Sequence, residues 1–164
     1  MSSQAVILIF HHSGHLKWYE EISLKQCFEI LGHHPIRLVC PAGTNLDRFI
    51  RIIPNIRVDF VPQAWMRRIQ RYNRMKILPA LYEKYSQFEF MLTYELDAFV
   101  FSDQLQTWCE SEWDYVGAPW FVEPPTRPLT YLGVGNSGFS LRKIQQCIRV
   151  MNQFGWLTNP VKSV

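Results

Sequence analysis

The sequence predicts an α/β domain with a mainly parallel central sheet, and three observations lead to that fold class. Short apolar segments typical of strands alternate along the chain with longer segments typical of helices. The first strand segment, Ala5–Phe10, is apolar without interruption, as in strands that are covered on both faces. The length of 164 residues and the hydrophobic content of 48% suit one domain, 1–164, with a substantial core.

Each further element is predicted from its apolar pattern and from the residues that bound it. Helices are expected to begin at Asn45 and Asp103, to end at Gly32 and Gly155, and to break at Pro79, because these residue types favour those positions. The expected strands, all short and apolar, are 5–10, 36–40, 57–61, 89–93, 115–118 and 139–141, with an extended continuation over 98–101. The expected helices are 17–31, 46–52, 69–85, 103–110 and 142–154, and a proline-rich loop is expected over 120–129.

Charge and cysteine content argue against several classes of protein. The net charge of +3 is too small to indicate a nucleic-acid-binding protein by itself. The four cysteines are far apart and form no C-x-x-C pair, so we expect reduced thiols in a cytoplasmic protein. The apolar run at 5–10 is too short for a membrane span or a secretory signal, so no span is expected.

Two carboxylates, Glu95 and Asp97, stand one residue apart inside the apolar segment FMLTYELDAFVF at 90–101. In an extended chain, residues i and i+2 point to the same side about 7 Å apart, so both acids can face one ligand. A divalent cation bound to a phosphate is one partner that offsets the cost of burying carboxylates. The alternative is a strand end at which the acids pair with nearby arginines. Two similar acid pairs occur within 110–114, in a polar segment expected to be a solvated helix end.

The loop HHSGH, which begins at His11, follows the first predicted strand. Ligands of parallel α/β sheets bind at the carboxyl ends of the strands, where this loop and the acid pair both open. Adjacent histidines in an extended chain point apart, so contact with a base or ribose is favoured over a metal site. His33 and His34 follow a helix-ending glycine and are expected in a surface turn.

The segment at 67–76 is the densest cluster of positive charge, and its cations are Arg67, Arg68, Arg71, Arg74 and Lys76. On a helix, Arg67, Arg71 and Arg74 would share one face. Such a face suits a diphosphate or a nucleic-acid backbone. A solvated helix face is the alternative.

The segment GVGNSG at 133–138 fits the pattern G-x-G-x-x-G. A dinucleotide fingerprint is rejected, because the segment lies late in the chain and no acid follows it to hold a ribose. The segment is interpreted as a turn that brings backbone close to a ligand, or as a plain turn. Trp120, beside the proline-rich loop, could stack on a sugar.

Four segments follow each other in order: YNRMK at 72–76, YELDAFVF at 94–101, DYVGAPW at 114–120 and GNSGFSL at 135–141. With them the chain resembles, over residues 5–145, a glycosyltransferase-like domain family of formerly unassigned function within the GT-A superfamily. The resemblance implies a Rossmann-like, three-layer GT-A fold. It also implies a nucleotide-sugar donor and transfer of the sugar to a glycan, a lipid or a protein.

The resemblance further implies roles for particular residues. Glu95 and Asp97 would hold Mn²⁺ or Mg²⁺ on the donor diphosphate, with Asp97 as the better candidate for direct contact. The metal would polarise the leaving diphosphate and stabilise its growing charge. The residues expected to contact the donor are Phe10, His11, Arg74, Lys76, Glu95, Asn136 and Ser137.

The chain departs from the superfamily pattern in ways that leave alternatives open. Glu95 replaces the common aspartate, and no histidine follows His34 and no acid follows Glu123, so a further late metal ligand is absent. The chain is shorter than many members, so the usual C-terminal portion is expected to be missing. Glu123 and Asp114 are the candidates for a general base. The alternatives are an inactive domain that binds a nucleotide sugar or glycan, and a nucleic-acid-binding module that uses the face at 67–76.

Overall fold

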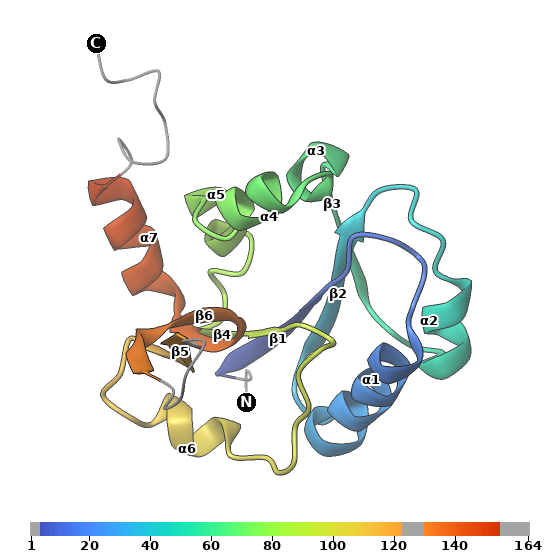
Figure 1. Ribbon diagram of the computed structural model, residues 1–164, viewed down its shortest axis with the longest axis horizontal. Helices are drawn as coiled ribbons and strands as arrows, with labels where there is room; N and C mark the ends of the chain where they lie inside the picture. Colours follow the sequence, from blue (N-terminus) through green and yellow to red (C-terminus); the bar gives the residue numbers. More distant parts are fainter. Residues whose placement is uncertain (1–3, 123–129, 155–164) are drawn as a thin grey trace.

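The computed structural model of the protein describes residues 4–122 and 130–154. Within these ranges, a six-stranded sheet with the order β3-β2-β1-β4-β6-β5 lies between two sets of helices (Figure 1). The pairs β3–β2, β2–β1 and β1–β4 are parallel, whereas β4–β6 and β6–β5 are antiparallel. The prediction of an α/β domain with a mainly parallel sheet is therefore confirmed.

The elements follow the predicted alternation of strands and helices. The strands are β1 (Ala5–Phe10), β2 (Ile36–Pro41), β3 (Val58–Val61), β4 (Phe90–Tyr94), β5 (Tyr115–Val122) and β6 (Thr130–Lys143). The helices are α1 (Trp18–Leu31), α2 (Asp47–Ile52), α3 (Gln63–Met66), α4 (Ile69–Met75), α5 (Pro79–Glu83), α6 (Leu105–Cys109) and α7 (Ile144–Gln153).

The core lies on both faces of β1, whose six residues are all buried. Successive side chains of a strand point to opposite faces, so β1 contributes to two hydrophobic clusters. Ile7 and Ile9 pack in the cluster that includes residues of α1, α2 and α6. Val6 and Leu8 pack in the cluster that includes residues of α3, α4, α5 and α7. This arrangement gives three layers, with the sheet in the middle (Figure 1).

Several predicted boundaries are wrong, most of them around β6. The segment 98–101 does not continue β4 directly, because a turn closed by a 2.9 Å hydrogen bond from Ala98 N to Glu95 O separates the two, and it forms no strand. The GVGNSG segment, predicted to be a turn, lies inside β6, which runs over 14 residues. Its pairing with β5 shifts register near these glycines, and Gly133 and Gly135 have φ values of 145° and 157°. Glycine tolerates this conformation, so the strand can continue through it.

The first residues of the expected proline-rich loop, 120–122, belong to a strand. Trp120 belongs to β5, which extends to Val122. The rest of that loop, and Gly155, lie outside the described residues. The predicted long helix is split into α4 and α5, and Pro79 stands at the first turn of α5, a position that tolerates its missing N–H. In the described ranges, no helix is both long enough and apolar enough to cross a membrane.

Candidate functional site

A cleft opens at the point where the strand order of the sheet reverses. The chain runs outward from β1 through β2 to β3, and then returns to place β4 on the other side of β1. Open α/β sheets bind ligands at such a switch point, outside the carboxyl ends of the strands. The cleft has a volume of about 430 Å³, and its walls include His11 and His12 after β1, and Glu95 and Asp97 after β4. The cleft therefore lies at the carboxyl ends of β1 and β4, the edge of the sheet at which a ligand was predicted to bind.

Glu95 and Asp97 reach this cleft by a turn and not by an extended strand. The predicted i, i+2 geometry is wrong, because the turn from Glu95 to Ala98 begins directly after β4. Asp97 is exposed on this turn, whereas the side chain of Glu95 is only 28% exposed. The two acids thus share a cleft but have different surroundings.

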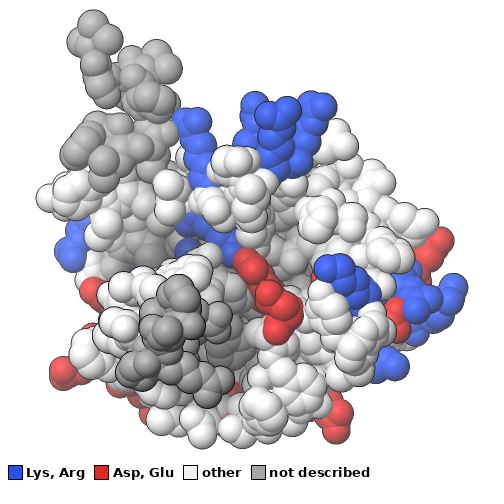
Figure 2. All heavy atoms as spheres, in the orientation of Figure 1, with Lys and Arg blue, Asp and Glu red and all other residues white. Residues whose placement is uncertain are grey.

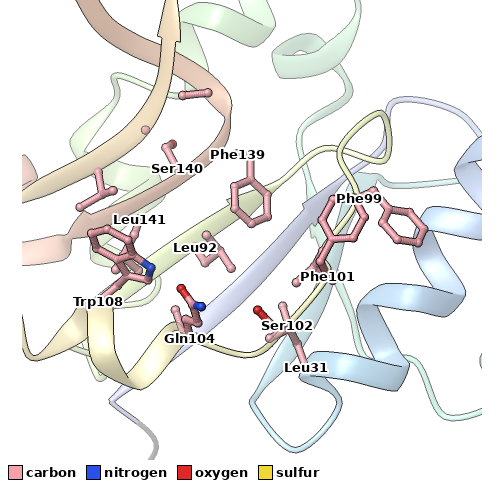
Figure 3. Close-up of a pocket in the computed structure, with 15 residues that line it drawn as sticks. Leu31, Leu92, Phe99, Phe101, Ser102, Gln104, Trp108, Phe139, Ser140 and Leu141 are labelled. Atoms are coloured by element: carbon pink, nitrogen blue, oxygen red, sulfur yellow. The ribbon is translucent and has the colours of Figure 1, made fainter.

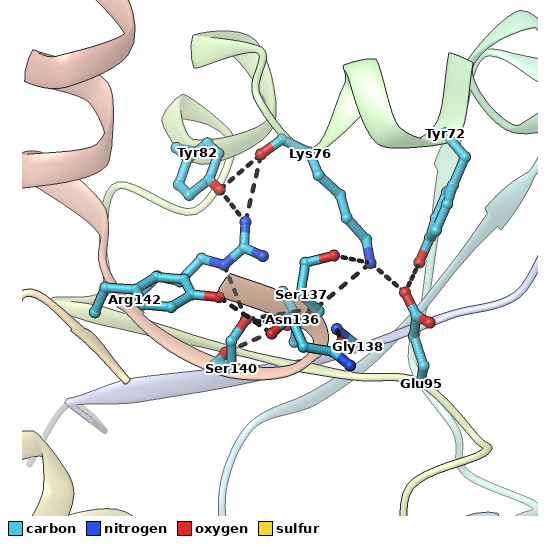
Figure 4. Close-up of polar contacts among 11 residues, drawn as sticks. Tyr72, Lys76, Tyr82, Glu95, Asn136, Ser137, Gly138, Ser140 and Arg142 are labelled. Atoms are coloured by element: carbon cyan, nitrogen blue, oxygen red, sulfur yellow. Dashed lines mark hydrogen bonds and ion pairs between the residues drawn. The ribbon is translucent and has the colours of Figure 1, made fainter. Parts of the chain in front are cut away.

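Glu95 is paired with a lysine, where the sequence suggested arginines as the alternative partners. The ammonium of Lys76 contacts Glu95 Oε1, and the Tyr72 hydroxyl donates to the same oxygen at 2.6 Å (Figure 4). Lys76 is only 3% exposed, and its Nζ lies 4.4 Å from the ring centre of Tyr72 and 5.6 Å from that of Phe10. Tyr72 and Lys76 are four residues apart at the end of α4, so they approach Glu95 from one face.

This pairing sets the ionisation of the three groups. Burial opposes ionisation of Glu95, but hydrogen bonds from Lys76 and Tyr72 outweigh it and hold the pKa of Glu95 below its usual value. Burial, reinforced by the charge of Glu95, raises the pKa of the Tyr72 hydroxyl. Burial lowers the pKa of Lys76, and its contact with Glu95 opposes that shift. The direct contact between the two groups favours an ionised pair, with a neutral phenol beside it.

We expect the contribution of Glu95 to stability to disappear in acid. The folded state lowers the pKa of Glu95 from 4.5, so its contribution is present above that pH and is lost as pH falls through the folded value. The measurement is urea unfolding of the wild type and of Glu95→Gln at pH 7, 5, 4 and 3. The difference in unfolding free energy should shrink at the two lowest values. A difference that stays constant down to pH 3 would contradict the pairing.

Strand β6 completes the site from the side opposite α4. Glu95 N donates to Gly138 O at 2.8 Å, and the ammonium of Lys76 lies 3.3 Å from Ser137 Oγ. Asn136 Oδ1 accepts a 3.0 Å hydrogen bond from Gly138 N. A Cβ atom at position 138 would lie 3.2 Å from Glu95 Oε2, so glycine allows this close approach of β6. The structure thus brings the predicted Asn136 and Ser137 together with Lys76 and Glu95 (Figure 4).

A second pocket, of about 740 Å³, lies on the other side of Glu95 and Tyr72, which also line the first cleft. Its walls include Arg142, Tyr115 and Trp120. The sequence did not single out Tyr72, Arg142 or Tyr115 as site residues. The four-residue spacing from Tyr72 to Lys76 was the available signal for one of them.

The arginines of the basic segment lie on the surface above this region, where Lys and Arg side chains gather over α3 and α4 (Figure 2). The predicted common face of Arg67, Arg71 and Arg74 is wrong, because the chain is extended at Arg68 between α3 and α4. Arg67 and Arg68 line the first cleft, whereas Arg74 is exposed on α4. Lys76 does not belong to this exposed surface.

The histidines occupy two separate places. His11 is buried in the wall of the cleft, and burial lowers its pKa, which favours the neutral ring there. His33 and His34 do lie in a turn, but their Nε2 atoms also lie 2.8 and 2.9 Å from Asp103 Oδ2. These three side chains are close enough together to hold a metal ion, and here His34 forms a hydrogen bond with Asp103 between the turn after α1 and the start of α6.

Of the two candidates for a general base, Asp114 does not line the cleft. Asp114 O accepts a hydrogen bond from Lys143 N, and Lys143 pairs with Phe90 at the amino end of β4. Asp114 therefore lies at the opposite end of this five-residue strand from Glu95, roughly 15 Å away along the strand. Glu123 lies outside the described residues.

A third cavity, of about 360 Å³, lies on the α6 side of the sheet (Figure 3). Its walls are mainly aromatic and aliphatic and include Phe99, Phe101, Trp108 and Phe139. The described residues that line it include polar but no charged side chains. This cavity therefore lacks the charges that a diphosphate or a metal ion needs.

A comparison with protein families matches residues 55–162 to the family described as "Protein of unknown function (DUF5672)". Because this match covers more than half of the sequence, the chain belongs to that family. The matched segment contains Lys76, Glu95, Asp97 and Arg142 but not β1. A search of curated proteins found no match.

Proposed function

We propose that this chain is a metal-assisted glycosyltransferase that binds a nucleoside-diphosphate sugar in the switch-point cleft and transfers the sugar to a glycan, lipid or protein. The observation that carries the proposal is the meeting of Glu95 and Asp97 with Arg67 and Arg68 around one cavity. Cations suit the diphosphate, and carboxylates suit a divalent ion bound to it. The order of motifs that resembles the GT-A superfamily gives the same assignment, with the cytoplasm as the expected location.

The carboxylates fit Mn²⁺ or Mg²⁺ unequally. Asp97 is exposed at the cleft and offers a carboxylate oxygen, whereas Glu95 Oε1 already accepts hydrogen bonds from Lys76 and Tyr72. Magnesium is commonly held by one or two carboxylates together with substrate phosphates, so Asp97 is sufficient as the main protein ligand. When bound, the ion would polarise the diphosphate as it leaves the sugar.

The chain's own residues would orient the donor. Arg67 and Arg68 on the rim would bind the diphosphate oxygens through charge-assisted hydrogen bonds. Phe10 and Tyr72 would hold the Lys76 ammonium in a fixed position beside Glu95. Asn136 and Ser137 on β6 line the second pocket, so they would contact only the end of the donor sugar that reaches past Glu95, and His11 would face the base or ribose. Arg74 stays a proposed donor contact from α4.

The test is calorimetric titration of the protein with the common nucleoside diphosphates, with and without Mn²⁺. We expect one base to be favoured and Mn²⁺ to increase the affinity about tenfold or more, because the ion neutralises the diphosphate beside Asp97. Binding of none of these nucleotides, with or without the ion, would contradict the proposal. Affinity for single-stranded nucleic acid that falls steeply with salt and ignores Mn²⁺ would favour the basic arginines as a nucleic-acid surface.

A domain that binds nucleotide sugars without turnover is the second candidate. The observation that favours it is the engagement of Glu95 by Lys76 and Tyr72, together with the position of Asp114 at the far end of β4. An assay of donor hydrolysis with Mn²⁺ separates the two candidates, because a competent transfer site passes some sugar to water. Nucleotide binding without any release of sugar would favour the binding domain.

A further inference from the structure

The second pocket contains a buried positive charge that no carboxylate of the described residues neutralises. Arg142 is 6% exposed, and its hydrogen bonds go to neutral groups only. Nε donates to Ser140 Oγ at 3.1 Å, and Nη1 donates to the Tyr82 hydroxyl at 2.5 Å and to Lys76 O at 3.4 Å (Figure 4). Arginine is rarely buried without an anionic partner, because the uncompensated charge is costly.

The remaining nitrogen of this guanidinium faces the pocket. Within the described ranges, Nη2 of Arg142 donates no hydrogen bond. Every fully buried side-chain nitrogen or oxygen in these ranges has a hydrogen-bond partner, so Nη2 cannot be fully buried. Nη2 is therefore accessible, and the pocket of about 740 Å³ is the space that Arg142 lines. A guanidinium that lines a concave site and has one nitrogen without a hydrogen bond can donate to a carboxylate or a phosphate.

The other charges of the pocket leave this cation in excess. Besides Arg142, the charged side chains of the wall are Lys76 and Glu95, which contact each other. Glu95 does interact with Arg142 through space, since Arg142 is among the charges that lower the pKa of Glu95. Its hydrogen bonds, however, come from Lys76 and Tyr72. A ligand that enters this pocket therefore meets one net positive charge.

The pocket also offers aromatic surfaces of the kind that sugars contact. Trp120 is half exposed on β5, and the Tyr115 ring lies beside Arg142, 5.6 Å from the guanidinium carbon. Tyr72 and Glu95 separate this pocket from the cleft assigned to the nucleotide. A molecule in the pocket would thus lie across Glu95 from the donor.

We infer that the second pocket binds an acidic sugar, with the carboxylate or phosphate of that sugar on Arg142. Naming this sugar the acceptor rests on the proposed function, whereas the anion site itself does not. The excess charge, the Nη2 atom without a hydrogen bond and the aromatic walls make the recognition of an anionic group the main source of specificity in this pocket.

The test compares ligands that differ only in charge. Binding of methyl glucuronide and of its neutral methyl ester to the wild-type protein is measured by ligand-observed NMR, and glucose 6-phosphate is compared with glucose in the same way. We expect each acidic sugar to bind at least about tenfold more tightly than its neutral counterpart. Equal binding of the acid and its ester, or binding of neither acid, would overturn the inference.

Substitutions at Arg142 test whether this residue causes the preference for the acidic sugar. Arg142→Gln retains hydrogen-bonding groups but removes the charge, so it should abolish the preference for the acidic sugar, and Arg142→Lys should keep part of it. Arg71→Gln removes an exposed arginine of α4 and should leave the preference unchanged. If Arg142→Gln does not fold, the comparison of acid and ester in the wild type still decides.

A competition experiment with nucleotide shows whether Arg142 binds the acidic sugar or the diphosphate of the nucleotide. The titration is repeated with nucleoside diphosphate and Mn²⁺ present, and we expect the glucuronide to bind alongside them. Displacement of the glucuronide by the nucleotide would overturn the inference, because Arg142 would then hold the diphosphate. Glucuronide binding that depends on Arg142 in a protein that binds no nucleotide would contradict the proposed function and leave the anion site intact.

Discussion

Replacing Glu95 with glutamine should lower the free energy of unfolding by about 3 kcal/mol, the lower end of the cost of breaking a buried ion pair. The side chain of Lys76 is 4% exposed and that of Glu95 is 28% exposed. Glutamine leaves the Lys76 ammonium buried without an anion, and this uncompensated charge is the main source of the loss. Urea unfolding at pH 7, followed by tryptophan fluorescence, measures the change.

Two controls test this explanation. The double variant Lys76→Met/Glu95→Gln removes both charges and should be more stable than Glu95→Gln alone, because no unpaired ammonium is left buried. Glu21→Gln breaks the more exposed pair with Arg48 and should change the unfolding free energy by less than about 1 kcal/mol. A loss in Glu95→Gln no larger than that in Glu21→Gln would show that the pair does not stabilise the fold.

The parallel half of the fold could be predicted because its signals are local. Ala5–Phe10 is apolar throughout, and this alone indicates a strand covered on both faces. The order of strands along the chain then predicts which strand ends meet, and so places Glu95 and Asp97 at a ligand-binding edge. Both inferences need only the apolar pattern and the rules for connecting parallel strands.

The length of β6 could not be predicted in the same way. Its central residues, GVGNSG, have the composition of a turn, and an isolated segment of this kind has little strand propensity. In the folded protein, pairing with β5 holds this segment extended, while β4 pairs with the following residues, 139–143. The paired residues, such as Ala118 and Asn136, are not neighbours in the sequence, and no local pattern records their pairing.

The positions of the buried charges in the site could not be predicted from the sequence either. Lys76 stands among arginines in the sequence, and nothing in that segment distinguishes the buried cation from the exposed ones. Its burial depends on the end of α4 lying above Glu95, which is a contact between distant parts of the chain. The same holds for Arg142, whose partner Tyr82 comes from α5.

Replacing Asp97 with asparagine should have a second large effect, which is to weaken the metal-dependent binding of nucleotide. Asp97 is exposed on the turn after β4, so Asp97→Asn should change the unfolding free energy by less than about 0.5 kcal/mol. The same substitution removes the carboxylate proposed as the main ligand of the divalent ion, and asparagine is a weaker ligand because it carries no charge. We expect the increase in nucleotide affinity caused by Mn²⁺ to fall by about tenfold or more, as measured by calorimetry.

The matched control is Glu112→Gln, which removes an exposed acid from the other group of closely spaced carboxylates. It raises the net positive charge by the same amount as Asp97→Asn but lies outside the cleft, so nucleotide affinity with Mn²⁺ should stay at the wild-type value. A general electrostatic effect would change both variants alike. If Asp97→Asn kept the full response to Mn²⁺, Asp97 would not be a metal ligand, and the response would have to come from the nucleotide carrying its own ion to Arg67 and Arg68.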